Sequence, residues 1–87
     1  MPELQPLFTE VEEVLERMIS QQRDKVRDVA LDILPHISPD ELQDPQDHPE
    51  VADDAMFNFE DGLLAGLMSA RMALRSTVFD GLTPPAP

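Results

Sequence analysis

Two histidines and the carboxylates near them are the residues of this chain best suited to bind a metal ion. His36 and His48 lie between residues 35 and 48, among Asp40, Glu41, Asp44, Asp47 and Glu50. Imidazole and carboxylate groups can hold Zn²⁺ or Mn²⁺, so a metal-binding protein is one hypothesis. However, no H-x-x-x-H or E-x-x-H spacing places two ligands on one helical face, and no EF-hand pattern is present. We therefore favour a solvated acidic connection and predict neither a metal site nor a cofactor.

Sequence patterns typical of catalysis are also missing. The chain has no Cys, Tyr or Trp, no G-x-S-x-G motif and no glycine-rich loop that would cradle a phosphate. Carboxylates can act as general acids and bases, but they need a cleft that perturbs their pKa values. A pair of helices offers little enclosure, so we expect the protein not to be an enzyme and predict no catalytic residues.

The charge of the chain restricts its partners. Acidic residues outnumber basic ones by 18 to 6, and the net charge is −12. Direct nucleic-acid binding is not expected, because phosphate neutralisation needs clustered Lys and Arg. Asp24, Asp28 and Asp32 repeat every four residues, which suggests either an acidic surface that mimics DNA or a solvated face partly balanced by Lys25 and Arg27.

Length and composition indicate one small domain. The chain has 87 residues, 41% of them hydrophobic, and small scaffolds without disulfides or metals are often stabilised by oligomerisation. The absence of Cys fits a reducing compartment. The N-terminus lacks the pattern of a signal peptide, and the longest apolar run is far shorter than the ~20 residues that cross a membrane. We therefore expect a soluble, cytoplasmic protein that does not bind membranes.

A first long helix is predicted from about residue 6 to residue 34. Apolar residues recur there at steps of three and four, the period of an amphipathic helix. They are Leu4, Leu7, Val11, Leu15, Met18, Val26, Val29 and Ile33. Thr9 and Glu12 form a T-x-x-E capping box, so the helix could begin there instead. Pro35 ends it, because the residue before a proline avoids the helical region.

The connection, residues 35–48, contains two signals for short helical turns. The stretch from Ser38 to Glu41 offers a cap, then Pro39 at the first helical position and an acid at the third. The stretch from Asp44 to Asp47 repeats this pattern more weakly. A second long helix is predicted from about residue 49 to residue 80, with Gly81 as the left-handed residue after its end. Residues 1–82 then form one domain, and residues 83–87 are predicted to be disordered.

The predicted fold is all-α, with the two long helices packed as an antiparallel hairpin that dimerises into a four-helix bundle. A short connection between two long helices favours antiparallel packing. A register with Leu34 opposite Glu50 brings opposite charges together three times. The predicted pairs are Arg71–Glu13, Arg75–Glu10 and Arg23–Asp61.

The second helix carries more apolar surface than one neighbouring helix can cover. We assign one of its faces to the first helix, and this face comprises Met56, Phe59, Leu63, Leu67, Ala70, Leu74 and Val78. A helix that is apolar nearly all round is expected to be buried, so a second copy or another partner should cover the rest. The predicted interface comprises Phe57, Gly62, Leu64, Ala65, Gly66, Met68, Ser69, Met72 and Ala73.

Three positions allow two interpretations each. Gly62 and Gly66 could let a second helix approach closely, or they could make room for a bulky neighbour within the chain. Gln22 interrupts the apolar stripe of the first helix. It could be a buried polar residue that fixes the helix register, or it could reach water.

The function predicted from these features is a non-catalytic protein–protein interaction module, an adaptor or regulator that self-associates through its second helix. The partner would be a second copy and also an apolar or basic protein surface. An acidic inhibitor that binds a basic surface of its target is the alternative, and a metal-binding protein is a weaker one.

Overall fold

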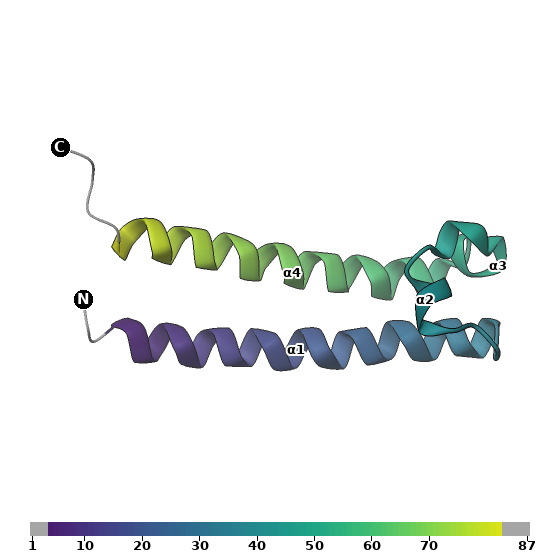
Figure 1. Ribbon diagram of the computed structural model, residues 1–87, viewed down its shortest axis with the longest axis horizontal. Coiled ribbons are helices and arrows are strands. Elements are labelled where there is room, and N and C mark those ends of the chain that lie inside the picture. Colours follow the sequence, from purple (N-terminus) through teal and green to yellow (C-terminus); the bar gives the residue numbers. More distant parts are fainter. Residues whose placement is uncertain (1–3, 83–87) are drawn as a thin grey trace.

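The computed structural model describes residues 4–82, and it describes the surroundings of side chains 6–78. The helical segments are α1 (Leu4–Ile33), α2 (Pro39–Leu42), the 3₁₀ helix η1 (Pro45–Asp47), α3 (Pro49–Ala52) and α4 (Ala55–Leu82). Helices α1 and α4 run antiparallel along a molecule of 53 × 26 × 21 Å, and the three short segments join them at one end (Figure 1). The predicted all-α antiparallel hairpin with a helical connection is confirmed. We refer below to its connection end and to its terminal end, where α1 begins and α4 ends.

Helix α1 is one continuous element. It begins at Leu4, so the capping box at Thr9 and Glu12 is not its start, and Glu12 instead reaches across to α4. The helix ends at Ile33, and the N–H of Leu34 still donates to the carbonyl of Ala30 at 2.8 Å. Pro35 therefore ends the helix as expected, because its ring is incompatible with continuing the helix through the preceding residue.

The connection is made of short helical turns, and a side-chain cap begins the first of them. The Glu41 N–H donates to the Ser38 hydroxyl and the Ser38 N–H donates to the Glu41 carboxylate, both at 3.2 Å. This reciprocal capping box starts α2. A proline occupies the first position of α2, η1 and α3, where a missing N–H costs nothing.

Helix α4 begins at Ala55 rather than near Pro49, which corrects the predicted boundary. The Asp54 carboxylate accepts a hydrogen bond from the Phe57 N–H at 2.8 Å. Asp54 is therefore the N-cap of α4, and residues 49–52 form the separate helix α3. At the other end α4 continues through Gly81 to Leu82, so the predicted end before Gly81 is also wrong. The predicted disorder of residues 83–87 lies outside the described residues.

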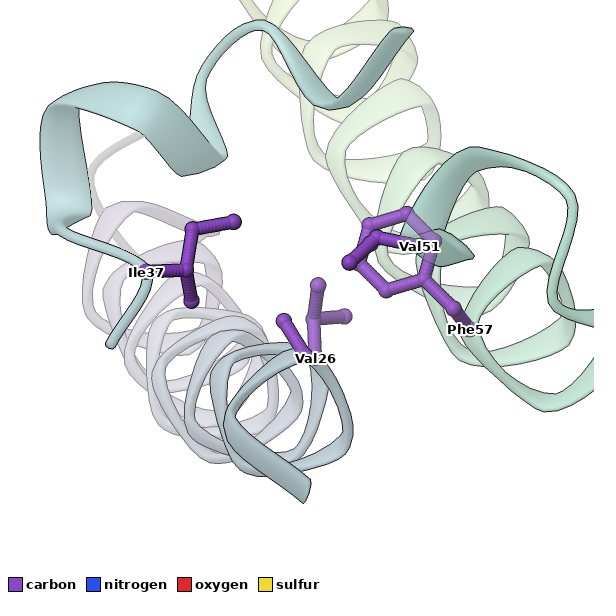
Figure 2. Close-up of a cluster of buried hydrophobic side chains, with 5 residues drawn as sticks. Val26, Ile37, Val51 and Phe57 are labelled. Carbon is purple, nitrogen blue, oxygen red and sulfur yellow. The ribbon is translucent and has the colours of Figure 1, made fainter. Parts of the chain in front are cut away.

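The hydrophobic core lies at the connection end. Val26 and Ala30 of α1, Ile37 of the connection, Val51 of α3 and Phe57 of α4 form one buried cluster (Figure 2). Among the described side chains, none outside residues 19–57 is buried. The connection therefore does more than join the helices, since it contributes two of the five residues of this cluster.

The two long helices face each other through positions that only partly match the predicted ones, since Leu15, Val26, Leu67 and Leu74 belong to both sets. The contact positions of α1 include Leu15, Ile19, Gln22, Val26 and Ala30, and those of α4 include Phe57, Glu60, Leu64, Leu67 and Leu74. Leu7, Val11 and Met18, predicted for the buried stripe, are exposed, and so are Met56, Phe59 and Leu63. Each exposed residue immediately precedes a contact position, whereas other predicted residues remain in contact, so each helix is turned from the predicted orientation by less than the ~100° of one residue step. A helix that is apolar on several sides has no unique phase, and the burial of Phe57 beside Val51 chooses one.

Candidate interaction surfaces

One broad side of the hairpin gathers exposed hydrophobic side chains. We define the apolar face as Leu7, Val11, Val14 and Met18 of α1 together with Met56, Phe59 and Leu63 of α4. The α1 residues are 41–56% exposed and the α4 residues are 46–65% exposed. Monomeric proteins rarely leave so many large apolar residues together in water unless the patch binds something.

Helix geometry places all seven residues on the same side. Each one directly precedes a residue directed at the opposite helix, as Met18 precedes Ile19 and Met56 precedes Phe57. A step of one residue backward turns the position by about 100° about the helix axis. Because α1 and α4 are right-handed and antiparallel, the same backward step turns both sets toward the same broad side of the hairpin.

Small residues of α4 continue the apolar face toward the terminal end. Gly66, Ala70 and Ala73 precede Leu67, Arg71 and Leu74 by one residue, and all three are exposed. The ion pairs Glu16–Arg71 and Glu12–Arg75 set the register. In that register the small residues of α4 lie beside the bulky residues of α1.

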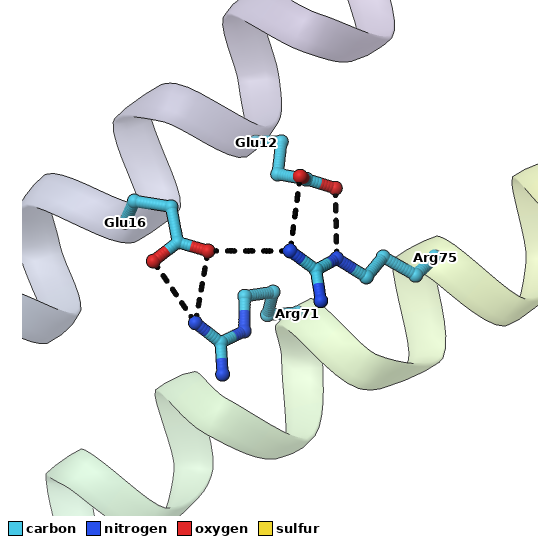
Figure 3. A network of polar contacts seen from close by, with 4 residues as sticks. All are labelled: Glu12, Glu16, Arg71 and Arg75. Atoms are coloured by element: carbon cyan, nitrogen blue, oxygen red, sulfur yellow. Dashed lines mark hydrogen bonds and ion pairs between the residues drawn. The ribbon is translucent and has the colours of Figure 1, made fainter.

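The opposite broad side is charged, and an ion-pair network joins the helices there (Figure 3). Both Glu16 carboxylate oxygens accept hydrogen bonds from Arg71 Nη1, at 2.9 and 3.0 Å. Arg75 donates to both Glu12 oxygens at 2.9 and 3.0 Å and to Glu16 at 3.4 Å. The hydrogen bond from Arg75 lowers the pKa of Glu12, and the hydrogen bond to Glu12 raises the pKa of Arg75.

These contacts correct the predicted ion pairs. Arg71 meets Glu16 rather than Glu13, and Arg75 meets Glu12 rather than Glu10. Within the described part of the chain Arg23 and Asp61 form no ion pair, although both line the same cleft. The antiparallel topology was predicted correctly, but the register of the two helices was not. For Arg71 and Arg75, the observed partner lies within one helical turn of the predicted one.

Gln22 is buried and links the two helices. Its side chain is directed at α4, where Nε2 donates to the Glu60 carbonyl at 2.8 Å and to the Glu60 carboxylate. Only 7% of the Gln22 surface is exposed. Gln22 is therefore a buried polar residue rather than one that reaches water. No buried side-chain nitrogen or oxygen among the described residues lacks a partner.

A cleft of about 730 Å³ lies where the connection folds against the two helices. Its apolar lining comprises Val26, Leu31, Ile37, Leu42 and Leu64. Its charged residues are Arg23, Arg27, Asp24 and Asp61, and Arg27 pairs with Asp24 at 3.3 Å. The two positive and two negative groups balance, so the cleft selects neither sign of ligand charge.

The histidine-containing connection does not assemble a ligand set. His48 Nε2 lies 3.1 Å from the Glu41 carboxylate. Hydrogen bonds from Ser38, followed by the charge of His48, lower the pKa of Glu41. Among the described residues, no three His, Asp or Glu side chains converge in a way that could hold a metal ion. The geometry gives the metal-binding alternative no support.

The residues predicted for the interface separate into two groups. Phe57 is buried in the core and is therefore not free to meet a partner, whereas Leu64, which packs against the core, and Met68 are half-buried. Gly62, Ala65, Gly66, Ser69, Met72 and Ala73 are exposed. A Cβ atom added at Gly62 or Gly66 would meet nothing within 4 Å, so these glycines do not make room for a neighbour within the chain.

The aspartate row is exposed but partly neutralised. Asp24, Asp28 and Asp32 all lie on the surface. Arg27 lies 3.3 Å from Asp24 and 3.6 Å from Asp28. Only part of this negative charge therefore remains available to a basic partner.

No protein-family model matches the chain, and no curated protein or solved structure shows significant similarity to it. Over the described residues, none of the helices combines the length and hydrophobicity needed to span a bilayer.

Proposed function

We propose that this protein is a non-catalytic protein–protein interaction module and that its apolar face is the docking surface. The observation that carries the proposal is the grouping of seven exposed large hydrophobic residues on one broad side of the hairpin. Burying such residues is favourable by roughly 1.5–3 kcal/mol for each fully covered side chain. A partner that covers this face gains that energy, and the isolated hairpin does not.

The regular helical structure under the apolar face supports this role. The face lies on two helices of 30 and 28 residues, and side chains on packed helices lose little backbone entropy when a partner binds. The docking surface therefore differs from the predicted interface on α4. It combines both helices and leaves Phe57 in the core.

An acidic inhibitor of a basic surface remains the alternative function. Its support is the exposure of the row formed by Asp24, Asp28 and Asp32 in a chain of charge −12. The contacts of Arg27 with two of these residues weaken that support. Binding of this kind would fall steeply with added salt, whereas docking on the apolar face would not.

Site-specific photocrosslinking in the native cell tests the proposal. A photoreactive residue at Phe59 samples the apolar face, and one at Met72 samples an equally exposed hydrophobic position on the charged side. We expect covalent protein adducts from position 59 and few from position 72. Equal or absent crosslinking from the two positions would refute the proposal.

A further inference from the structure

We propose that the partner of the apolar face is a second copy of this chain, so that two hairpins pack face to face into a four-helix bundle. This inference rests on the proposed function, because it names the occupant of the same surface. Three independent features of the hairpin support it, namely the charge of the face, the incomplete packing of the terminal end and the shape of the surface.

The first feature is the absence of carboxylates from the face. On each helix the apolar face belongs to a row of residues that come directly before the contact positions. On α1 this row continues from Met18 to Gln21, Lys25 and Val29, and on α4 it ends at Thr77. None of these positions is acidic, although the chain has 18 acidic residues, and the first carboxylate of the row is Asp32, at the connection end of α1. A face built for a basic partner would carry acids. Two chains of charge −12 can instead meet only where neither buries a carboxylate, because an unpaired buried charge is strongly unfavourable.

The second feature is the lack of a core at the terminal end. All described buried side chains fall within residues 19–57. Nevertheless Leu7, Val11 and Val14 of α1 lie beyond this range with 41–56% of their surface exposed. Small scaffolds without disulfides or metals are commonly completed by oligomerisation. A second hairpin would bury these residues and supply the core that this end lacks.

The third feature is the match between bulky and small residues. At the terminal end Val11, Val14 and Met18 form a ridge on α1, and Gly66, Ala70 and Ala73 leave a shallow strip on α4. When a second hairpin packs with its α1 over α4 of the first, the ridge of each copy meets the strip of the other. Such self-complementarity is the requirement of a two-fold interface.

The size of the face is sufficient for a stable dimer. The broad side measures 53 by 26 Å. A rectangle of these extents encloses roughly 1,400 Å², so this side has room for the ~800 Å² that each partner contributes to a standard interface.

Light scattering coupled to size exclusion tests the proposal on the full chain at tens of micromolar. We expect the mass of a dimer. Met56→Lys should weaken association by at least about tenfold, and Val14→Lys should do the same from the other helix. Met72→Lys is the matched control, because Met72 is a methionine of the same helix with similar exposure, 71% against 65% for Met56, on the other broad side. It should leave the dissociation constant unchanged.

The possible results separate the two proposals. The far-UV circular dichroism spectrum shows whether each variant keeps its helices, and the agreement of Met56→Lys with Val14→Lys guards against a local folding defect. A monomer that still crosslinks other proteins from position 59 would overturn the second-copy proposal and leave the interaction module standing. A monomer without such adducts would overturn both. A dimer broken by Met72→Lys but not by the other two variants would place the interface elsewhere and also overturn the proposal.

Discussion

The two ends of the hairpin hold α1 against α4 by different interactions. At the connection end, Val26, Val51 and Phe57 belong to a cluster from which water is excluded. At the terminal end, the ion pairs of Glu12 and Glu16 with Arg71 and Arg75 join the helices, and all four side chains are partly exposed. Exposed ion pairs specify alignment more than they add stability. The hydrophobic cluster therefore stabilises the connection end, whereas ion pairs align the terminal end, and it is this second end that the proposed dimer would complete.

The largest expected effect comes from removing the aromatic ring at the centre of the connection end. Phe57→Ala should lower the free energy of unfolding by about 3–5 kcal/mol, because it leaves a cavity in the core. Urea unfolding of dilute protein measures the loss. Phe59→Ala is the control, since Phe59 is on the same helix but exposed, and it should cost less than about 1 kcal/mol there. Equal losses would contradict the difference between the two ends.

Gln22 lies where the two ends meet, and its removal should have the next largest effect. Gln22→Leu leaves the carbonyl and the carboxylate of Glu60 without their donor. The expected loss is about 1–3 kcal/mol in urea unfolding. Combining it with Glu60→Gln in a double-mutant cycle isolates the coupling between the two side chains. A coupling near zero would show that the contact does not help to fix the helix register.

Glycine substitution should produce a smaller gain in stability. Gly62 lies two residues from both Glu60 and Leu64, so it is directed away from α1, and an added Cβ meets nothing in the chain. Gly62→Ala should therefore stabilise the helix by roughly 0.5–1 kcal/mol through helix propensity. Gly66→Ala should give the same gain in dilute protein. A loss of stability at Gly66 alone as concentration rises would show that another surface approaches it.

The smallest effect concerns the pH dependence of the terminal end. The hydrogen bond from Arg75 lowers the folded-state pKa of Glu12. This carboxylate therefore stabilises the fold above its unfolded pKa, about 4.3, and that contribution is lost as the pH falls through the lower folded value. Glu12→Gln should make the melting temperature less sensitive to pH in that range. Glu10→Gln removes the same charge from a residue with no ion pair in the described part of the chain, and it should not reproduce the change.

Local sequence signals determined the two long helices of this protein, the end of the first one and the first short helix of the connection. The apolar period predicted α1, Pro35 ended it, and the pair of Ser38 and Glu41 predicted α2. These signals act between residues no more than four apart, so they are readable without knowledge of the fold. Asp54 is a local signal of the same kind, because an aspartate at the N-cap accepts a hydrogen bond from the N–H three residues later, here that of Phe57. Taken as the N-cap, Asp54 places the start of α4 correctly.

Only the tertiary structure decided how each helix is rotated, and with that which residues form the candidate site. α4 carries apolar residues on several sides, and a rotation of less than one residue step exchanges Met56, Phe59 and Leu63 for Phe57 and Leu64 as contact positions, while Leu67 and Leu74 face α1 in both cases. The observed rotation of α4 depends on the contact of Phe57 with α3 and on the hydrogen bond between Gln22 and Glu60. Gln22 and Glu60 are 38 positions apart in the sequence. The hydrophobic effect is proportional to the buried area and has no direction. The apolar pattern of the sequence therefore does not distinguish between the two rotations of the helix about its axis. The packing of the connection against the two helices made one of them the core and left the other exposed.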